Sequence, residues 1–199
     1  MAKLVNWNYF EKKLKEKQLL LFTPLEITRV LGVSAVAASF LVHRYTRKGF
    51  IARIKRGLYG FPGELPPEPY IANRLCEPSY VSLEFALAYH RVIPETVYEI
   101  TSVTPKATRH FNTLGKAFTY RRIKKAGFTG YVSIRRAGVS YLIAEPEKAF
   151  IDAVYLRAFS GKGPLQRFDR EKLNRAKALR YAALFGNDRT VNEARRLLS

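Results

Sequence analysis

Residues 23–49 have the sequence TPLEITRVLGVSAVAASFLVHRYTRKG, which holds the clearest helix signals in the first third of the chain. Thr23 and Glu26 have the spacing of a capping box, in which each side chain accepts a hydrogen bond from the other residue's backbone. Pro24 lies between them, and proline favours the first position of a helix. The pattern predicts a helix that begins at Pro24 and runs to about Leu31.

A second helix follows after a tight turn. Gly32 can take the left-handed conformation that ends the first helix, and Ser34 is a strong N-cap for the next. We expect that helix to span about residues 35–48 and to end at Gly49. Apolar residues at helical spacing give it an inward stripe, formed by Ala38, Leu41, Val42 and Tyr45.

The flanking sequence completes a small domain. Upstream, Trp7, Phe10 and Leu14 recur at helical spacing within residues 6–17. Downstream, the strand-like segments FIARI and LYGF flank Lys55-Arg56-Gly57, which is typical of a short hairpin with glycine at the turn. Three helices followed by a basic hairpin predict a winged helix-turn-helix over residues 1–62.

In that fold the second helix of the pair enters the major groove of DNA. Its small residues would let the backbone approach closely, alanine and valine could touch thymine methyls, and Ser39 and His43 could hydrogen-bond base edges. Arg44 and Arg47 are better suited to phosphates. The full set of expected DNA-binding residues, with the hairpin cations, is Ser34, Ala35, Val36, Ser39, Phe40, His43, Arg44, Arg47, Arg53, Lys55 and Arg56. Burial of Val36 and Phe40 against a protein partner is the alternative.

The charge of the chain also favours a nucleic-acid partner. The net charge is +19 and the sequence pI is about 10.2. The first 62 residues hold 12 basic and 3 acidic residues, a net charge of +9. Cations that contact phosphates release counterions, which drives binding to DNA. An anionic membrane surface, an acidic protein or plain solubility are the other uses of such a charge.

A proline-rich linker, GELPPEP (63–69), separates this domain from residues 70–199. The second part predicts helices over 82–90, 145–159, 169–185 and from Thr190 onward, and strands over 97–103, 118–123, 131–134 and 139–144. The expected fold class is therefore α+β, with a mixed α/β C-terminal domain that holds a small, mostly antiparallel sheet.

Residues 100–144 contain no Asp or Glu. Alternation along strands would send the interleaved aromatics inward and the cations outward, which predicts one basic sheet face. That face could bind phosphate, an acidic protein or nothing. Its nine cations are Lys106, Arg109, Lys116, Arg121, Arg122, Lys124, Lys125, Arg135 and Arg136.

No pattern indicates an enzyme, a cofactor or a metal site. The chain lacks a Walker loop, GxGxxG, HExxH and zinc-finger spacing, and its single cysteine, Cys76, excludes a disulfide within the chain. The N-terminus has no apolar core of a signal peptide and no apolar run reaches a membrane span, so we expect a cytoplasmic protein without a membrane partner. A nuclease site assembled from scattered acids, such as Glu84 and Glu147, is the remaining catalytic possibility.

Five segments, in order, resemble the AbiEi-like antitoxins, transcriptional regulators of type IV (AbiE-type) toxin–antitoxin systems linked to abortive infection. They are RGLYGFP (56–62), YVSLEFALAYHRVIPE (80–95), ITSVTPKATRHF (100–111), YRRIKKAGFTGY (120–131) and AEPEKAFIDAVYLR (144–157). The resemblance covers nearly the whole chain.

The resemblance implies a repressor that binds inverted repeats in its own promoter through the N-terminal winged helix. It also implies a C-terminal domain that counters a nucleotidyltransferase-like toxin, directly or indirectly. It places DNA binding on the cations and polar residues named above, and the antitoxin surface on Lys106, Arg109, Arg121, Arg122, Lys124 and Lys125. The alternatives are a nuclease-like DNA-processing enzyme and a basic protein that binds RNA or the ribosome.

Overall fold

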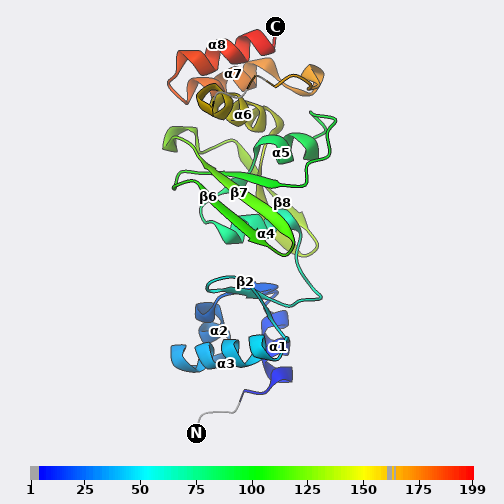
Figure 1. The fold of residues 1–199 in the computed structure, drawn as a ribbon, viewed down its shortest axis with the longest axis vertical. Coiled ribbons are helices and arrows are strands. Elements are labelled where there is room, and N and C mark those ends of the chain that lie inside the picture. Colours follow the sequence, from blue (N-terminus) through cyan, green and yellow to red (C-terminus); the bar gives the residue numbers. More distant parts are fainter. Residues whose placement is uncertain (1–4, 161–162, 164) are drawn as a thin grey trace. The chain divides into compact units, whose positions relative to one another are not determined.

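Three helices and a small sheet form the N-terminal unit of the computed structural model, which describes residues 5–160, 163 and 165–199 (Figure 1). By internal contacts, this unit comprises residues up to Pro67 with Arg136–Val139, and the second unit comprises Glu68–Arg135 with Ser140–Ser199. The elements of the first unit are α1 (Trp7–Glu16), β1 (Leu21–Phe22), α2 (Pro24–Leu31), α3 (Ala35–Arg47), β2 (Ala52–Lys55) and β3 (Leu58–Gly60).

The predicted helix pair is present with the expected caps. The Thr23 hydroxyl accepts a hydrogen bond from the Glu26 backbone N–H at 3.2 Å, and the Glu26 carboxylate accepts one from the Thr23 N–H at 2.6 Å. Gly32 ends α2 in the left-handed conformation with φ of 64°, and Ser34 caps α3. The two helices are bent by 113° at this break, within the range of helix-turn-helix units.

The predicted inward stripe of α3 is confirmed. Ala38, Leu41, Val42 and Tyr45 are all buried, with at most 5% of any of them exposed. They pack in one core with Phe10 and Leu14 of α1 and with Phe22 of β1. The Trp7 ring lies 5.0 Å from the Tyr45 ring, so aromatic contacts join the first helix to the third.

The hairpin pairs with a strand that the sequence did not reveal. β3 lies between β1 and β2, and both neighbours are antiparallel to it. Gly57 closes the β2–β3 turn with φ of 78°, a conformation that glycine adopts without steric cost. β1 is two residues long, too short to leave an alternation pattern in the sequence.

The second unit combines strands with helices and ends in a run of helices. Its elements are α4 (Glu68–Leu75), β4 (Tyr80–Val81), α5 (Leu83–Tyr89), β5 (Ile100–Thr104), β6 (Arg109–Thr113), β7 (Lys116–Arg122), η1 (Lys125–Gly127), β8 (Tyr131–Arg136), β9 (Val139–Ala144), α6 (Pro146–Ser160), η2 (Arg170–Lys172), α7 (Arg175–Ala183) and α8 (Asp188–Leu197). α4 begins at Glu68, inside the segment predicted as linker, because Pro69 suits the first helical turn. The α+β class holds for the chain.

The C-terminal sheet is larger and more mixed than expected. It has six strands in the order β6-β7-β5-β4-β9-β8. β4 pairs with β5 and β6 with β7 in antiparallel fashion, whereas β5 with β7 and β4 with β9 are parallel. The sequence predicted a small, mostly antiparallel sheet, and the observed sheet differs in having six strands and two parallel pairings. The neighbour of β5 is β7 and not β6, the next strand along the chain, and no local pattern in the sequence specifies this order.

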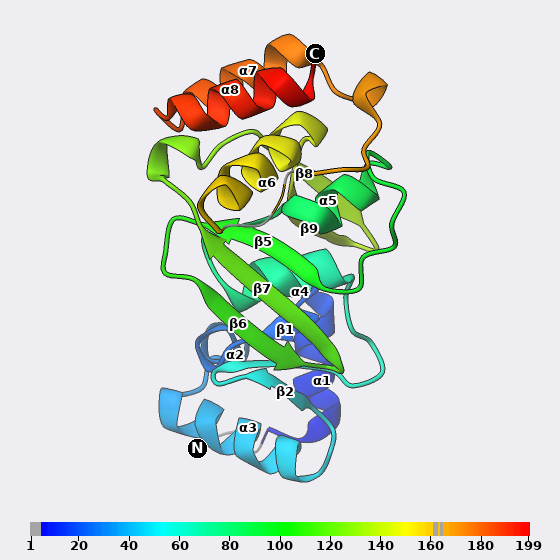
Figure 2. The same cartoon turned by 45° about the horizontal axis from the view of Figure 1, so that its top comes forward.

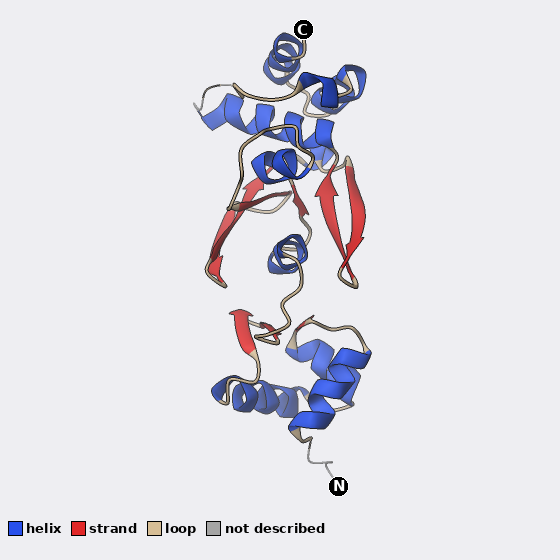
Figure 3. Ribbon diagram, turned by 90° about the vertical axis from the view of Figure 1, so that its right-hand side faces the viewer, coloured by secondary structure: helices blue, strands red, loops and turns tan. Residues whose placement is uncertain are grey.

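Helices cover both faces of this sheet. α4 packs on one face, where the Tyr120 hydroxyl of β7 donates to the Ala72 carbonyl at 2.6 Å. α5 and α6 cover the other face, and α7 and α8 lie side by side over α6 (Figure 2). The sheet is twisted, so its strands appear on both sides of the central helices in Figure 3. β5 is buried along its whole length.

Two helix starts differ from the expectation. Leu173 is extended, and Asn174 caps α7, so the predicted helix over 169–185 is broken into η2 and α7. α8 is capped by Asn187, and Thr190 is a buried residue of its first turn, not its cap. In both helices the capping residue is an asparagine, Asn174 or Asn187, and not the residue at which the sequence predicted the helix to begin, Asp169 or Thr190. No single helix in the described part of the chain is long and apolar enough to cross a membrane.

A side chain of α4 completes the sheet beside the short strand β4. The Asn73 amide accepts a hydrogen bond from the Leu142 N–H at 2.6 Å and donates one to the Leu142 carbonyl at 3.3 Å. Asn73 thus supplies the two bonds that a longer neighbouring strand would make to β9.

Asn73→Leu is expected to destabilise the C-terminal unit by about 2–4 kcal/mol, because two backbone groups lose their partners. Urea unfolding followed by circular dichroism measures this. Asn112→Leu, at an exposed position of β6, is the control and should cost less than about 0.5 kcal/mol. Equal stability of the two variants would show that water replaces the amide at Leu142.

Candidate nucleic-acid interface

The outward side of α3 is exposed along the whole helix. The residues predicted there are all exposed, namely Ser34, Ala35, Val36, Ser39, Phe40, His43, Arg44 and Arg47. The Ser34 hydroxyl is used as the helix cap, accepting from the Ala37 N–H at 3.2 Å. Val36 is 66% exposed and Phe40 is 72% exposed, unusual values for large apolar side chains.

A groove runs between α3 and the hairpin. It has a volume of about 360 Å³, and we name it the α3 groove. Three of the predicted residues of α3 (Ser39, His43, Arg47) and Arg53 of β2 lie along it, so residues from two separate elements meet at one site. Its other lining residues are Pro24, Val42, Thr46 and Tyr59.

β2 positions its cation by strand register. Arg53 is paired with Tyr59 of β3, and both line the α3 groove. Ile54 points the other way into the core and is 4% exposed. Arg56 is exposed at the turn and Lys55 is half-buried. The α3 groove therefore has one arginine from the helix and one from the hairpin.

Arg44 does not belong to this groove. Its guanidinium donates to the Val5 carbonyl at 3.1 Å and lies 5.1 Å from the centre of the Tyr45 ring. The Tyr45 hydroxyl donates to the same carbonyl at 3.0 Å, and burial raises the pKa of that hydroxyl. Arg44 thus ties Val5 to α3, a contact between distant residues that the sequence pattern did not indicate.

The acid-free segment does not form one basic face. Phe118 and Tyr120 of β7 are buried under α4, and Arg122 lies on their side of the sheet. Arg109 pairs directly with Tyr120 and shares that side, whereas Arg121 lies on the opposite face. Arg135 and Arg136 are consecutive in β8 and also point to opposite faces. The expectation of a single cationic face is wrong, because neighbouring cations on a strand must alternate.

Three of the lysines in this segment have protein partners. The Lys106 ammonium donates to the Glu77 carbonyl, and Lys116 forms an ion pair with Glu68. The Lys124 ammonium donates to the Phe185 carbonyl at 2.8 Å. Lys125 begins η1 and is exposed. These contacts give part of the acid-free segment a structural explanation.

Several acids considered for catalysis also have partners. Glu84 pairs with Arg157 at 3.0 Å, and Glu147 accepts from the Asn174 N–H at 3.1 Å. Burial acts to raise the pKa of Glu145, but hydrogen bonds from Tyr181 and Lys177 hold it below its usual range. Among the described residues, no group of three or more His, Cys, Asp or Glu side chains could hold a metal ion.

A buried ion pair lies at the centre of the C-terminal unit. Lys148 and Asp152, one turn apart on α6, contact each other with both side chains 0% exposed. Asp152 also accepts from the Tyr80 hydroxyl at 3.0 Å and the Ser82 hydroxyl at 2.8 Å. Burial raises the pKa of Asp152 and lowers that of Lys148, against their mutual attraction. Complete burial favours a structural role for this cluster.

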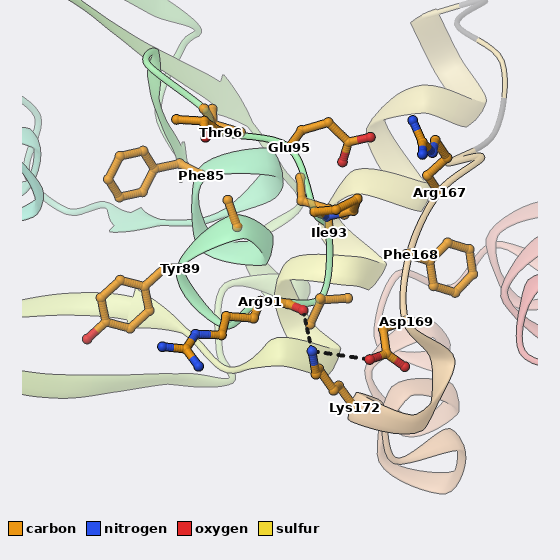
Figure 4. Close-up of a pocket in the computed structure, with 14 residues that line it drawn as sticks. Phe85, Tyr89, Arg91, Ile93, Glu95, Thr96, Arg167, Phe168, Asp169 and Lys172 are labelled. Atoms are coloured by element: carbon orange, nitrogen blue, oxygen red, sulfur yellow. Dashed lines mark hydrogen bonds and ion pairs between the residues drawn. The ribbon is translucent and has the colours of Figure 1, made fainter.

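A larger groove, of about 770 Å³, lies beside α5 (Figure 4). Phe85, Ile93 and Phe168 are among its apolar lining residues. Lys172 closes one end by donating to the Arg91 carbonyl at 2.8 Å and pairing with Asp169 at 3.1 Å. No local pattern in the sequence indicates this groove, since its two walls come from segments that are distant in the chain.

A comparison with protein families supports the resemblance noted from the sequence. Residues 12–62 match the family model described as "Transcriptional regulator, AbiEi antitoxin". This segment runs from α1 to the end of the β2–β3 hairpin and includes α3 and the α3 groove. A comparison with curated proteins gives no match. Over residues 12–62, the chain therefore carries the sequence pattern of the AbiEi antitoxin transcriptional regulators.

Proposed function

We propose that this protein represses its own promoter, binding inverted repeats in double-stranded DNA through a winged helix-turn-helix over residues 1–62. The α3 groove carries this proposal. It brings Ser39 and His43 of α3 together with Arg47 and Arg53, two arginines that come from different elements. Polar groups that read bases, flanked by cations that hold phosphates, are the two kinds of contact that DNA recognition needs.

The division of roles follows from position. Ser39 and His43 lie in the middle of α3 and are suited to base edges. Arg47 at the end of α3 and Arg53 on β2 border the α3 groove and are suited to phosphates. Arg56, exposed at the hairpin turn, extends the cationic border as the wing. Ser34 and Ala35, at the start of α3, would let the backbone approach the DNA closely, and Lys55 would add positive charge beside Arg56.

For residues 70–199 we propose the antitoxin role, against a nucleotidyltransferase-like toxin and without a reaction of its own. Lys106, Lys116 and Lys124 contact protein groups, as described above. The other six cations of the segment, all at least partly exposed, are Arg109, Arg121, Arg122, Lys125, Arg135 and Arg136. They lie on both faces of the sheet, so one flat docking face is not available to them. This arrangement favours an indirect antagonism of the toxin over a single large interface.

Fluorescence anisotropy with the full chain tests the DNA-binding proposal. One probe is the duplex upstream of its own gene, and the others are a scrambled duplex and a structured RNA of equal length. The promoter duplex is expected to bind on the order of 10³-fold more tightly than the scrambled duplex at physiological salt. Equal affinity for all three probes would overturn specific repression, and preference for the RNA would favour the RNA-binding alternative.

Growth rescue tests the antitoxin proposal separately. Cells that express the toxin-like gene expected directly downstream should grow again when the full chain is co-expressed. The Arg47→Ala/Arg53→Ala variant should rescue equally well when both genes are placed under foreign promoters, because repression then has no part. No rescue by the unaltered chain would remove the antitoxin role and leave DNA binding in place.

A further inference from the structure

The outer side of α3 presents an apolar pair with no structural explanation. Val36 and Phe40 lie four positions apart, on the same side of the helix, and are 66% and 72% exposed. Exposing both side chains to water forgoes the free energy of their burial. A folded domain that keeps such a pair outermost is expected to bury it against something else.

The other residues in the first half of α3 limit the kinds of contact that this surface can make with a base. Before His43, the helix holds Ala35, Ala37 and Ser39 as its other outward or half-buried residues. None of these is an Arg, Lys, Asn or Gln, the residues that form the strong hydrogen-bonded contacts to guanine and adenine. The surface can therefore recognise base edges mainly through apolar contact. In the major groove the apolar group on a base edge is the 5-methyl group of thymine.

The charge around the pair favours DNA over a protein as the occupant. Arg47 and Arg53 line the neighbouring α3 groove, and the first 62 residues carry a net charge of +9. A partner that reaches Val36 and Phe40 must also neutralise these cations. Duplex DNA does so with two phosphate strands that border an accessible groove floor, which matches an apolar centre between cations.

We propose that Val36 and Phe40 read thymine methyl groups in the major groove, so that the operator is recognised by the methyl pattern of its thymines. This proposal rests on the DNA-binding function proposed above. Arg44 donates to the Val5 carbonyl. Arginine is the usual partner of guanine. If thymine methyl groups carry the recognition, Arg44 is not needed for a guanine contact and can hold Val5 instead.

The test begins with selection of binding sites by the full chain from a randomised duplex library. In the enriched duplex, each thymine is then replaced by deoxyuridine, which removes the methyl group and keeps base pairing. Each contacted methyl is expected to contribute about fourfold in affinity, the value of one buried methyl group. Two such positions would lower the affinity of the unaltered chain about fifteenfold.

Protein variants assign the effect to the apolar pair. Val36→Ala/Phe40→Ala should bind the thymine duplex more weakly and should bind the thymine and deoxyuridine duplexes equally. Leu25→Ala is the matched control, because Leu25 is 58% exposed on α2, and it should keep the full discrimination. Val36, Phe40 and Leu25 are all exposed, so the thermal unfolding temperature should be the same in every variant.

The outcomes separate this proposal from the function on which it rests. No enriched duplex would overturn both. An enriched duplex that binds equally well with deoxyuridine would overturn methyl recognition alone. Discrimination that persists in Val36→Ala/Phe40→Ala would place the methyl contacts elsewhere and also overturn it. A change in sedimentation of that variant, with unchanged DNA affinity, would show that the pair contacts another protein copy instead.

Discussion

Lys148→Met is expected to destabilise the C-terminal unit by about 3–5 kcal/mol, the largest stability effect we predict for a single side chain. The substitution keeps the volume but leaves the Asp152 carboxylate buried without its cation. The Tyr80 and Ser82 hydroxyls alone then hold that charge. Urea unfolding followed by far-ultraviolet circular dichroism measures the loss.

Two controls make this result specific. Trp7 is the single tryptophan and lies in the N-terminal unit, so its fluorescence transition should not move. The double variant Lys148→Met/Asp152→Leu should recover part of the lost stability, because no buried charge is left, although the Tyr80 and Ser82 hydroxyls lose their acceptor. A cost below about 1 kcal/mol for Lys148→Met would show that the cluster is not a charged pair in the folded protein.

Arg47→Ala/Arg53→Ala is expected to weaken binding to the promoter duplex about 100-fold, roughly tenfold for each guanidinium removed. The logarithmic salt dependence of binding should become shallower by about two units, since two phosphate contacts are removed. The scrambled duplex should lose affinity to the same degree, because phosphate contacts carry no sequence information. Anisotropy titrations at several salt concentrations give all three quantities.

Lys12→Ala/Lys17→Ala is the matched control for this variant. It removes the same charge from exposed positions at and just after α1, away from the α3 groove. It should change the salt dependence by much less than one unit. Equal effects of the two double variants would show that binding follows the net charge of the unit and not the arrangement around α3.

The parts of the fold that the sequence predicted correctly are those specified by neighbouring residues. The capping box at Thr23, the stop at Gly32 and the stripe of α3 are local signals, and each of them is present. The two-residue strand β4 and the parallel pairing of β5 with β7 depend on contacts between distant segments. Such pairings leave no periodic pattern in a single sequence.

The same distinction applies to the candidate site. Helical spacing predicted which side of α3 faces outward, and the exposure of Val36 and Phe40 agrees with it. The hydrogen bond from Arg44 to the Val5 carbonyl could not be predicted, because 39 positions in the sequence separate the two residues. A run of cations without acids suggested one surface in the C-terminal unit, but strand alternation sends Arg121 and Arg122 to opposite faces.

The histidine resonances offer the most direct test that α3 enters the DNA. The chain has three histidines, of which His43 lies on α3 while His90 and His110 lie in the C-terminal unit. Proton NMR of the imidazole C2–H signals, assigned by single His→Asn variants, follows each of them as promoter duplex is added. We predict that the His43 signal shifts on binding while those of His90 and His110 stay in place. A His43 signal that does not move on a duplex shown to be bound would contradict the account.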